Sequence, residues 1–169
     1  MIVLGIDPGS QGALCFLDPS TDHTEFIDTP DTKQLWESLQ YIEDYLKIKA
    51  PRYIAIEDVH SLGGMSAKSN FQFGRNLGLI EALIHTCNCE DDVIYVQPKF
   101  WQKTCEIVFS YRSDMTTQQK AKLRKTTIAA KAISLYPDAK IYGPKGGLKD
   151  GRSDALMIAH YLKLKYGRK

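Results

Sequence analysis

Residues 1–12 of the chain, MIVLGIDPGSQG, combine a hydrophobic run with a single acidic residue at its end. Residues 2–6 are almost continuously hydrophobic, which is typical of a strand covered on both faces. Asp7 follows at a place where packing alone would not favour a carboxylate, and a buried carboxylate is costly unless it is hydrogen-bonded, paired or bound to a metal. Pro8, Gly9 and Gly12 predict a turn, and the apolar residues 13–17 predict a second strand. We therefore expect a β-hairpin that carries Asp7 at its turn.

The composition is that of a globular protein. With 169 residues, of which 43% are hydrophobic, the chain can bury one substantial core, and residues 1–169 are expected to form a single domain. No apolar stretch approaches the roughly 20 residues that a membrane span needs, and residues 1–12 lack the basic start and cleavage site of a signal peptide. We therefore expect a soluble, intracellular protein.

The four cysteines do not have the pattern of a disulfide framework or of a zinc site. Cys87 and Cys89 form a CxC pair, but no second CxC, CxxC or HxxxH pair accompanies them. The sequence therefore predicts reduced thiols at Cys15, Cys87, Cys89 and Cys105.

Charge is distributed unevenly along the chain. Residues 1–98 contain 6 Lys and Arg against 15 Asp and Glu, whereas residues 99–169 contain 16 against 5. This asymmetry is consistent with a C-terminal half that binds a polyanion beside an N-terminal half that supplies carboxylates. A solvated basic surface explains the same count equally well.

The remaining pattern predicts a three-layer α/β fold. We expect further strands over 24–28, 53–56 and 93–96, amphipathic helices over 32–49 and 66–88, a loop over 59–69, and a basic helical region over 99–131. Ser153 is expected to cap a final helix after the glycine-rich segment 143–152. An antiparallel start joined through helices to later strands implies a mixed sheet covered on both faces. Trp36 and Trp101 are expected in the core or half-buried, not as base-stacking platforms.

Three acidic residues stand where the pattern calls for apolar ones. Asp7 and Glu57 each end a strand, and Asp154 opens the last helix, with Asp150 four residues earlier. Taken singly, each has an ordinary explanation: a turn cap, a surface ion pair or a helix-dipole partner. Together in one covered site they would repel unless a cation lay among them. Oxygen ligands without paired Cys or His favour Mg²⁺ or Mn²⁺, and two such ions about 4 Å apart can promote phosphodiester hydrolysis.

Four segments together resemble the RuvC crossover-junction endodeoxyribonucleases, over nearly the whole chain. They are IVLGIDPGS (2–10), YIAIE (53–57), FGRNLGL (73–79) and SDALMIA (153–159). The resemblance implies an RNase H-like fold, a homodimer, and Mg²⁺-dependent paired nicking of four-way (Holliday) DNA junctions in recombination and repair. It also implies two Mg²⁺ ions per active site, with Mn²⁺ as a substitute, held by Asp7, Glu57 and Asp154. The expected products carry 5′-phosphate and 3′-hydroxyl ends.

The chain departs from bacterial members at the fourth ligand. Those members have an acid or histidine three residues before the last aspartate, where this chain has Gly151, so Asp150 is the candidate for that role. In its longer basic stretch and its compact length the chain resembles phage and other viral members. The resemblance implies a location in the cytoplasm of a bacterial cell or a phage-infected host. The candidate DNA contacts are Lys68, Arg75, Lys99, Lys103, Lys122, Lys125, Lys149 and Arg152.

The sequence is also compatible with two other functions. A sugar-kinase or actin-like ATPase domain shares the hairpin and an early phosphate-binding turn, although such proteins need a second related domain that 169 residues do not accommodate. A non-catalytic protein that binds branched DNA would be expected to have lost one of the three acids, and all three are present.

Overall fold

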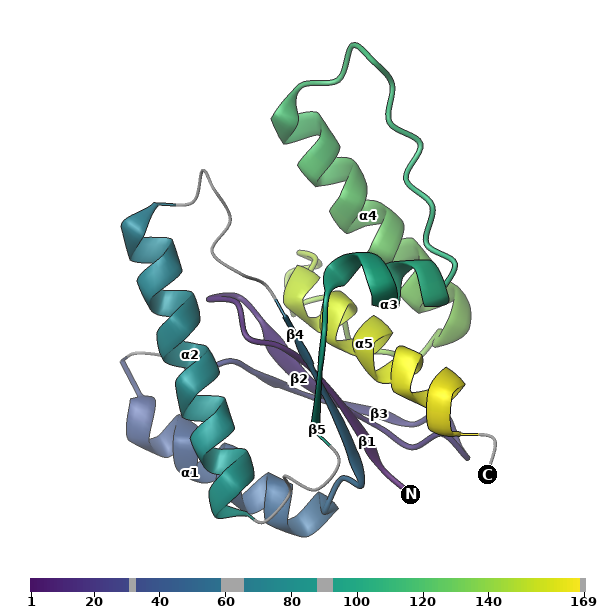
Figure 1. The fold of residues 1–169 in the computed structure, drawn as a ribbon. Coiled ribbons are helices and arrows are strands. Elements are labelled where there is room, and N and C mark those ends of the chain that lie inside the picture. Colours follow the sequence, from purple (N-terminus) through teal and green to yellow (C-terminus); the bar gives the residue numbers. More distant parts are fainter. Residues whose placement is uncertain (31–32, 59–65, 88–92, 168–169) are drawn as a thin grey trace.

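A mixed β-sheet between two layers of helices forms the body of the structure (Figure 1). The computed structural model describes residues 1–30, 33–58, 66–87 and 93–167. Within them the elements, in chain order, are β1 (Val3–Asp7), β2 (Ala13–Leu17), β3 (Thr24–Asp28), α1 (Leu35–Lys49), β4 (Tyr53–Glu57), α2 (Ala67–Thr86), β5 (Val93–Val96), α3 (Pro98–Thr104), α4 (Thr117–Leu135) and α5 (Asp150–Tyr166).

The strands of the described residues pair in the order β3-β2-β1-β4-β5. Strand β2 runs antiparallel to both β3 and β1, whereas β4 runs parallel to both β1 and β5. This arrangement confirms the predicted mixed sheet. The later strands β4 and β5 run parallel to β1 because helical crossovers, through α1 and α2, precede them. The carboxyl ends of β1 and β4 therefore meet at the same edge of the sheet.

Successive side chains of each strand point to opposite faces of the sheet, and this alternation divides the core into two layers. Leu4 and Ile6 of β1 face the layer formed by α1 and α2, together with Ile54 and Ile56 of β4. Val3 and Ala55 face the opposite layer, which contains α5 and parts of α3 and α4. Since side chains alternate with a period of two, the odd-numbered residues of β1 and β4 all face α5.

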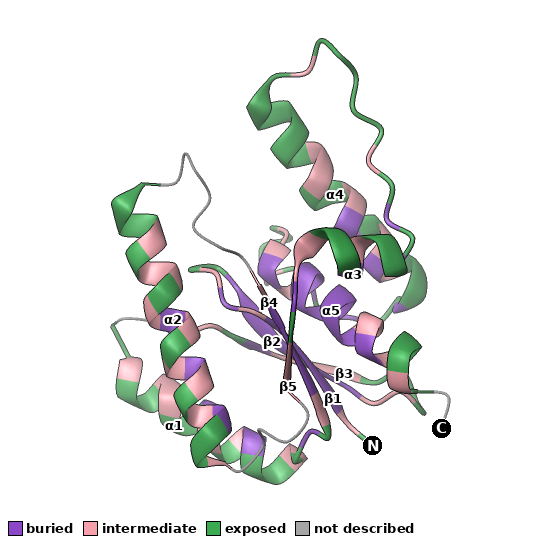
Figure 2. Cartoon of the chain, viewed as in Figure 1, coloured by how far each residue is buried: buried purple, intermediate pink, exposed green. Residues whose placement is uncertain are grey.

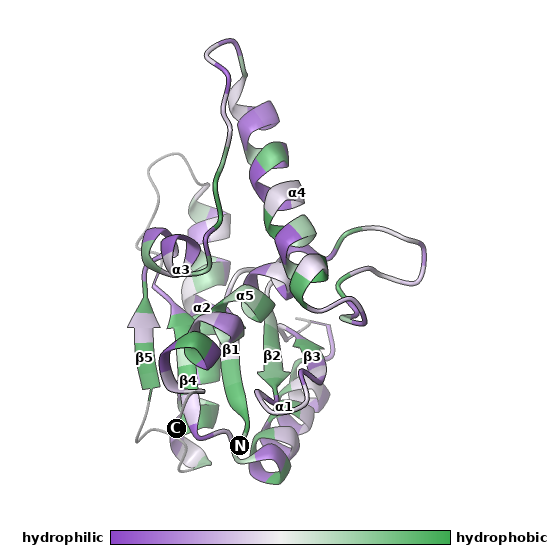
Figure 3. Ribbon diagram, turned by 90° about the vertical axis from the view of Figure 1, so that its right-hand side faces the viewer, coloured by the Kyte–Doolittle hydropathy of each residue, from purple (hydrophilic) through white to green (hydrophobic). Residues whose placement is uncertain are grey.

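The central helix of the second layer is α5, which contacts β1, β2, β4, α3 and α4. It is buried over most of its length, whereas the outer half of α4 is exposed and extends beyond the rest of the fold (Figure 2). The view in Figure 3 shows the same extension from the side, with hydrophilic and hydrophobic residues mixed along α4 and mostly hydrophobic residues along β1, β2 and β4.

The predicted continuous helical region over 99–131 is wrong. The chain forms α3, then an extended segment, and then α4. Glu106 has a φ of 55°, which ends the first helix. A new helix begins at Thr116, whose hydroxyl accepts from the backbone of Gln119 at 3.2 Å while the Gln119 side chain accepts from the Thr116 amide at 2.8 Å. This reciprocal capping box fixes the start of α4.

Three smaller expectations also need revision or remain untested. Ser153 does not cap α5, which already begins at Asp150; its hydroxyl donates to the Asp150 carbonyl at 2.8 Å inside the first turn. Trp101 is fully buried as expected, but Trp36 is 79% exposed. Cys15 and Cys105 are buried free thiols in the described part of the chain, while Cys89 and residues 59–65 of the predicted loop lie outside it.

None of the described helices is both long enough and apolar enough to cross a membrane.

Candidate active site

The ends of β1 and β4 carry two of the predicted carboxylates. The two strands pair in parallel up to Ile6 and Ile56, so Asp7 and Glu57 are the next residues on neighbouring strands. Both residues are odd-numbered, like Val3 and Ala55, and side chains alternate between the two faces of the sheet. The side chains of Asp7 and Glu57 therefore lie on the face covered by α5. Pairing and alternation together bring these two acids to one place.

The start of α5 adds the third and fourth carboxylates. It approaches β1 unusually closely, because a Cβ on Gly5 would lie 2.2 Å from the Ala155 carbonyl oxygen. A Cβ on Gly151 would likewise lie 2.1 Å from the carbonyl oxygen of Gln11 in the β1–β2 turn. This contact explains why a glycine occupies position 151: any side chain there would push the helix away from the turn. Asp154 and Asp150, four residues apart, share the helix face beside Asp7 and Glu57.

The backbone around Asp7 fixes the orientation of its side chain. The Gly9 amide donates to Asp7 Oδ1 at 2.9 Å. The Gly9 carbonyl accepts from Thr29 Oγ1 at 3.1 Å and from Asn76 Nδ2 at 3.3 Å. Asn76 is itself buried on α2 and accepts from Gln72 Nε2 at 2.9 Å. Contacts from Thr29 and from Asn76 on α2 therefore hold the turn that carries Asp7.

Glu57 is fixed from another direction. Its side chain is buried, with 6% of the residue exposed, and its Oε1 accepts a hydrogen bond from Trp101 Nε1 at 3.1 Å. Trp101 belongs to α3, which begins directly after β5 with Pro98 in its first turn. The indole both shields Glu57 from water and holds one of its oxygens.

Burial raises the pKa of each of the three central carboxyls. The pKa of Asp7 rises from 3.8 to about 6, and that of Glu57 from 4.5 to about 7, in each case mainly through burial. The charge of Asp7 adds to the rise at Glu57. The pKa of Asp154 lies well above its usual value for the same reason, and the charges of Asp7, Glu57 and Asp150 add to the rise. The acids are thus close enough to repel one another.

Two cationic side chains of α4 approach this cluster. Arg124 Nη2 lies 3.6 Å from Asp154 Oδ2, and Lys125 Nζ lies 2.6 Å from Asp150 Oδ2. The positive charge of Arg124 lowers the pKa values of Asp7, Glu57 and Asp154, which partly opposes the effect of burial.

The carboxylate oxygens of these acids are suitable ligands for a hard divalent cation, although the side chains are not in coordinating positions. No group of three His, Cys, Asp or Glu side chains in the described residues is arranged so that it could hold a metal ion as it stands. Asp154 Oδ1, however, is buried without a hydrogen-bond partner, and a buried carboxylate oxygen requires one. Carboxylate oxygens are the ligands that Mg²⁺ and Mn²⁺ prefer. Asp7, Glu57, Asp154 and Asp150 are the residues that could supply them.

The candidate DNA contacts lie on several elements. Lys68 and Arg75 are on α2, Lys99 and Lys103 on α3, Lys122 and Lys125 on α4, and Lys149 and Arg152 at the start of α5. The beginnings of α2 and α4 both extend past the end of the sheet that carries Asp7 and Glu57 (Figure 1). Lys68 and Lys122 are exposed there.

Lys149 and Arg152 have a different environment. Arg152 Nε lies 2.6 Å from Asp28 Oδ1, and Lys149 Nζ lies 3.4 Å from Asp28 Oδ2. A phosphate would have to compete with Asp28 for both residues. These two cations therefore pair with Asp28, whereas Lys125 of α4 pairs with Asp150.

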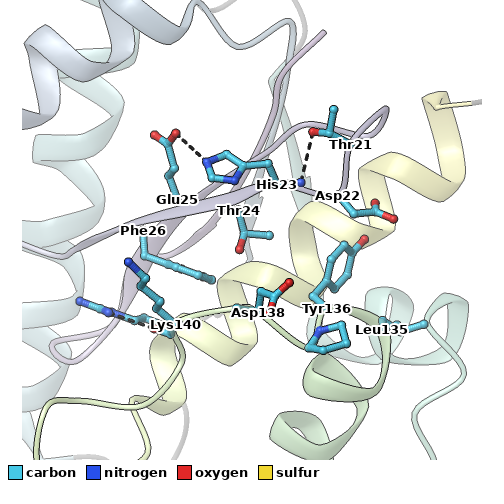
Figure 4. A pocket seen from close by; sticks show the side chains of 13 residues that line it. Thr21, Asp22, His23, Thr24, Glu25, Phe26, Leu135, Tyr136, Asp138 and Lys140 are labelled. Carbon is cyan, nitrogen blue, oxygen red and sulfur yellow. Dashed lines mark hydrogen bonds and ion pairs between the residues drawn. The ribbon is translucent and has the colours of Figure 1, made fainter.

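A hollow of about 690 Å³ lies next to Arg152, between the β2–β3 turn and the segment that joins α4 to α5. Figure 4 shows Phe26, Tyr136 and Lys140 among the side chains that line it. Arg152 and Asp154 are two residues apart on α5, and side chains with this spacing do not face the same side of a helix. The hollow is therefore separate from the carboxylate cluster.

The sequence patterns did not single out Arg124, Asn76 or the hydrogen bond of Trp101. Arg124 and Asn76 each precede a buried isoleucine by four residues, Ile128 and Ile80 respectively. This spacing places them on the inward face of their helices. A polar residue in register with buried ones is the signal that could have identified both.

Comparison with known proteins bears on the fold. No protein-family model and no curated protein matches the chain. Among solved structures, it is similar to Thermus thermophilus RuvC in complex with a Holliday junction substrate, with 15% identity, a TM-score of 0.61, and coverage of 99% of this chain and 97% of that one. The fold is that of RuvC. A second structure of T. thermophilus RuvC matches with 17% identity and a TM-score of 0.56, over 98% and 97% of the two chains. The similarity inferred from the four sequence segments is confirmed at the level of the fold.

Proposed function

We propose that this chain is a structure-selective endonuclease that resolves four-way (Holliday) DNA junctions by paired, Mg²⁺-dependent hydrolysis of phosphodiester bonds. The single observation that carries the proposal is the convergence of Asp7, Glu57 and Asp154 on the face of the sheet covered by α5. Their mutual repulsion and the unpartnered Asp154 Oδ1 favour a divalent cation among them. The similarity to an RuvC structure solved with a Holliday junction supports junctions as the substrate.

The residues of the chain have separate tasks in this proposal. Asp7, Glu57 and Asp154 hold the ions, and Asp150 is the candidate fourth ligand. When bound, Mg²⁺ supplies Lewis-acid activation of water and stabilisation of the leaving oxygen. Gly9 and Trp101 keep the oxygens of Asp7 and Glu57 in place. The expected products have 5′-phosphate and 3′-hydroxyl ends.

The basic residues position the substrate. Exposed lysines on α2, α3 and α4 can contact phosphates without reading the base sequence; they are Lys68, Lys99, Lys103, Lys122 and Lys125. This fits an enzyme that selects DNA by shape.

Two paired nicks require two active sites, and a homodimer would supply them. The outward face of α2 is a suitable contact surface. Phe71 is 72% exposed there, and around Gly74 and Gly78 there is open space where a Cβ would be. A second copy of the helix could approach closely along these glycines.

Cleavage of labelled four-way, three-way and linear DNA with Mg²⁺, Ca²⁺ or chelator tests the proposal. We expect Mg²⁺ to support paired nicks in the four-way junction only, and Asp7→Asn to abolish nicking while junction binding persists. Asp44→Asn, at an exposed position on α1, is the matched control and should keep full activity. Nicking by Asp7→Asn at the wild-type rate would remove Asp7 from the mechanism. Binding without nicking by the wild type would favour a non-catalytic junction-binding protein, and stabilisation by ATP but not by junction DNA would favour an ATPase.

A further inference from the structure

The cationic residues of α4 that approach the carboxylates form a contact distinct from an ordinary surface ion pair. Arg124 and Lys125 are consecutive, and they pair with Asp154 and Asp150, which are one helical turn apart on α5. Asp154 is 9% exposed, whereas the Arg124 side chain is 35% exposed, so this pair joins a half-buried cation to a buried carboxylate. The two pairs together connect the middle of α4 to the start of α5.

Arg124 acts on more than its nearest partner. Its charge also lowers the pKa values of Asp7 and Glu57, so it partly compensates all three acids. One positive charge nevertheless leaves the cluster incompletely compensated. Its nitrogen lies 3.6 Å from Asp154 Oδ2, and Asp154 Oδ1 has no partner. A small divalent cation would neutralise more charge and occupy less space than a guanidinium.

We infer that Arg124 is the resident counter-ion of the carboxylate cluster, and that it competes with the divalent cation for Asp154. This inference rests on the proposed function, because it takes the same acids as the metal ligands. Binding of the metal moves the guanidinium away from Asp154 and weakens the contact between α4 and α5. Arg124 and the ion thus occupy the site alternately, which lowers the affinity for metal in the absence of substrate.

The chain provides its own reporter for metal binding. Trp101 Nε1 donates to Glu57 Oε1, so an ion that takes up Glu57 changes the surroundings of this indole. The only other tryptophan, Trp36, is exposed and can be replaced by phenylalanine to leave a single signal. Titration of this Trp36→Phe protein with Mn²⁺, followed by fluorescence and by calorimetry, gives a dissociation constant that does not depend on activity.

Variants at position 124 test the competition. We expect Arg124→Gln to bind Mn²⁺ about tenfold more tightly than the parent, a factor within the range typical of coupling between two sites. Arg124→Lys keeps the charge and should stay closer to the parent. The control is Arg112→Gln, because Arg112 pairs with Asp114 on an exposed segment, and it should leave the affinity unchanged.

The outcomes separate this inference from the proposed function. Equal or weaker binding by Arg124→Gln overturns the competition but leaves the nuclease proposal standing. Absence of Mn²⁺ binding by every protein overturns both. If Arg124→Gln does not fold, amide hydrogen exchange in the parent protein tests the inference instead. Mn²⁺ should speed the exchange of amides in residues 117–127. Unchanged or slower exchange there overturns the inference.

Discussion

Replacement of Glu57 by glutamine should stabilise the metal-free protein at neutral and alkaline pH. The pKa of Glu57 is raised from 4.5 to about 7, mainly by burial. The folded state therefore binds a proton that the unfolded state releases between these two values. The resulting stability is fully present below about pH 4.5 and is lost as the pH rises through about 7. Since one pKa unit corresponds to about 1.4 kcal/mol, the loss amounts to about 3 kcal/mol. Glu57→Gln keeps an acceptor for Trp101 but carries no charge, so it should not show this loss.

Urea unfolding in EDTA, followed by circular dichroism between pH 4.5 and 8, measures the effect. We expect Glu57→Gln to exceed the wild type by about 2–3 kcal/mol at pH 8, with a difference that shrinks towards zero near pH 4.5. Glu106→Gln serves as the control, because the Glu106 side chain is 85% exposed, and its difference from the wild type should stay small. Added Mg²⁺ should stabilise the wild type more than Glu57→Gln. A pH-independent difference, or a less stable Glu57→Gln at pH 8, would refute the reasoning.

Three further predictions concern DNA binding, packing and assembly. The double variant Lys122→Ala/Lys125→Ala should weaken junction binding, and the slope of log affinity against log salt concentration should become shallower by about 2. Fluorescence anisotropy at several salt concentrations measures both. An unchanged slope would mean that neither lysine contacts phosphate. Gly5→Ala should lower the unfolding free energy by at least about 1–3 kcal/mol, because the added Cβ would meet the backbone of α5. Gly147→Ala, with open space around the added Cβ, is the control and should be near neutral. Equal melting temperatures of the two variants would contradict the close approach of α5 to β1. Gly78→Arg should sediment as a monomer and the wild type as a dimer, and a wild-type monomer would argue against the α2 interface.

Most of the sheet could be predicted from the sequence because its strands are short hydrophobic runs with clear ends. Residues 13–17, 24–28 and 93–96 form strands with the predicted bounds. The break between α3 and α4 was missed because the prediction followed the basic residues of 99–131, although, of these, only Arg112 lies between Cys105 and Thr116. Thr116 and Gln119 have the T-x-x-Q spacing of a capping box, which is a sequence signal for a helix start that charge patterning overlooks. The positive φ at Glu106 has no such signal in the sequence.

The site could be predicted in part for a similar reason. Acids at the ends of apolar strands are conspicuous in a sequence, and strand pairing then places Asp7 beside Glu57. The partners of these acids come from distant segments: Trp101 is 44 residues from Glu57, and Asn76 is 67 residues from Gly9. Such contacts follow from the packing of α2, α3 and α4, which a single sequence does not specify.

The central claim is that Asp7, Glu57 and Asp154 share divalent cations. A crystal structure with Mn²⁺, analysed by anomalous scattering, tests it most directly. The account predicts anomalous peaks within 2.0–2.5 Å, roughly the usual metal–oxygen range, of oxygens from all three carboxylates. Absence of any peak at the cluster, with Arg124 still paired to Asp154, would contradict it.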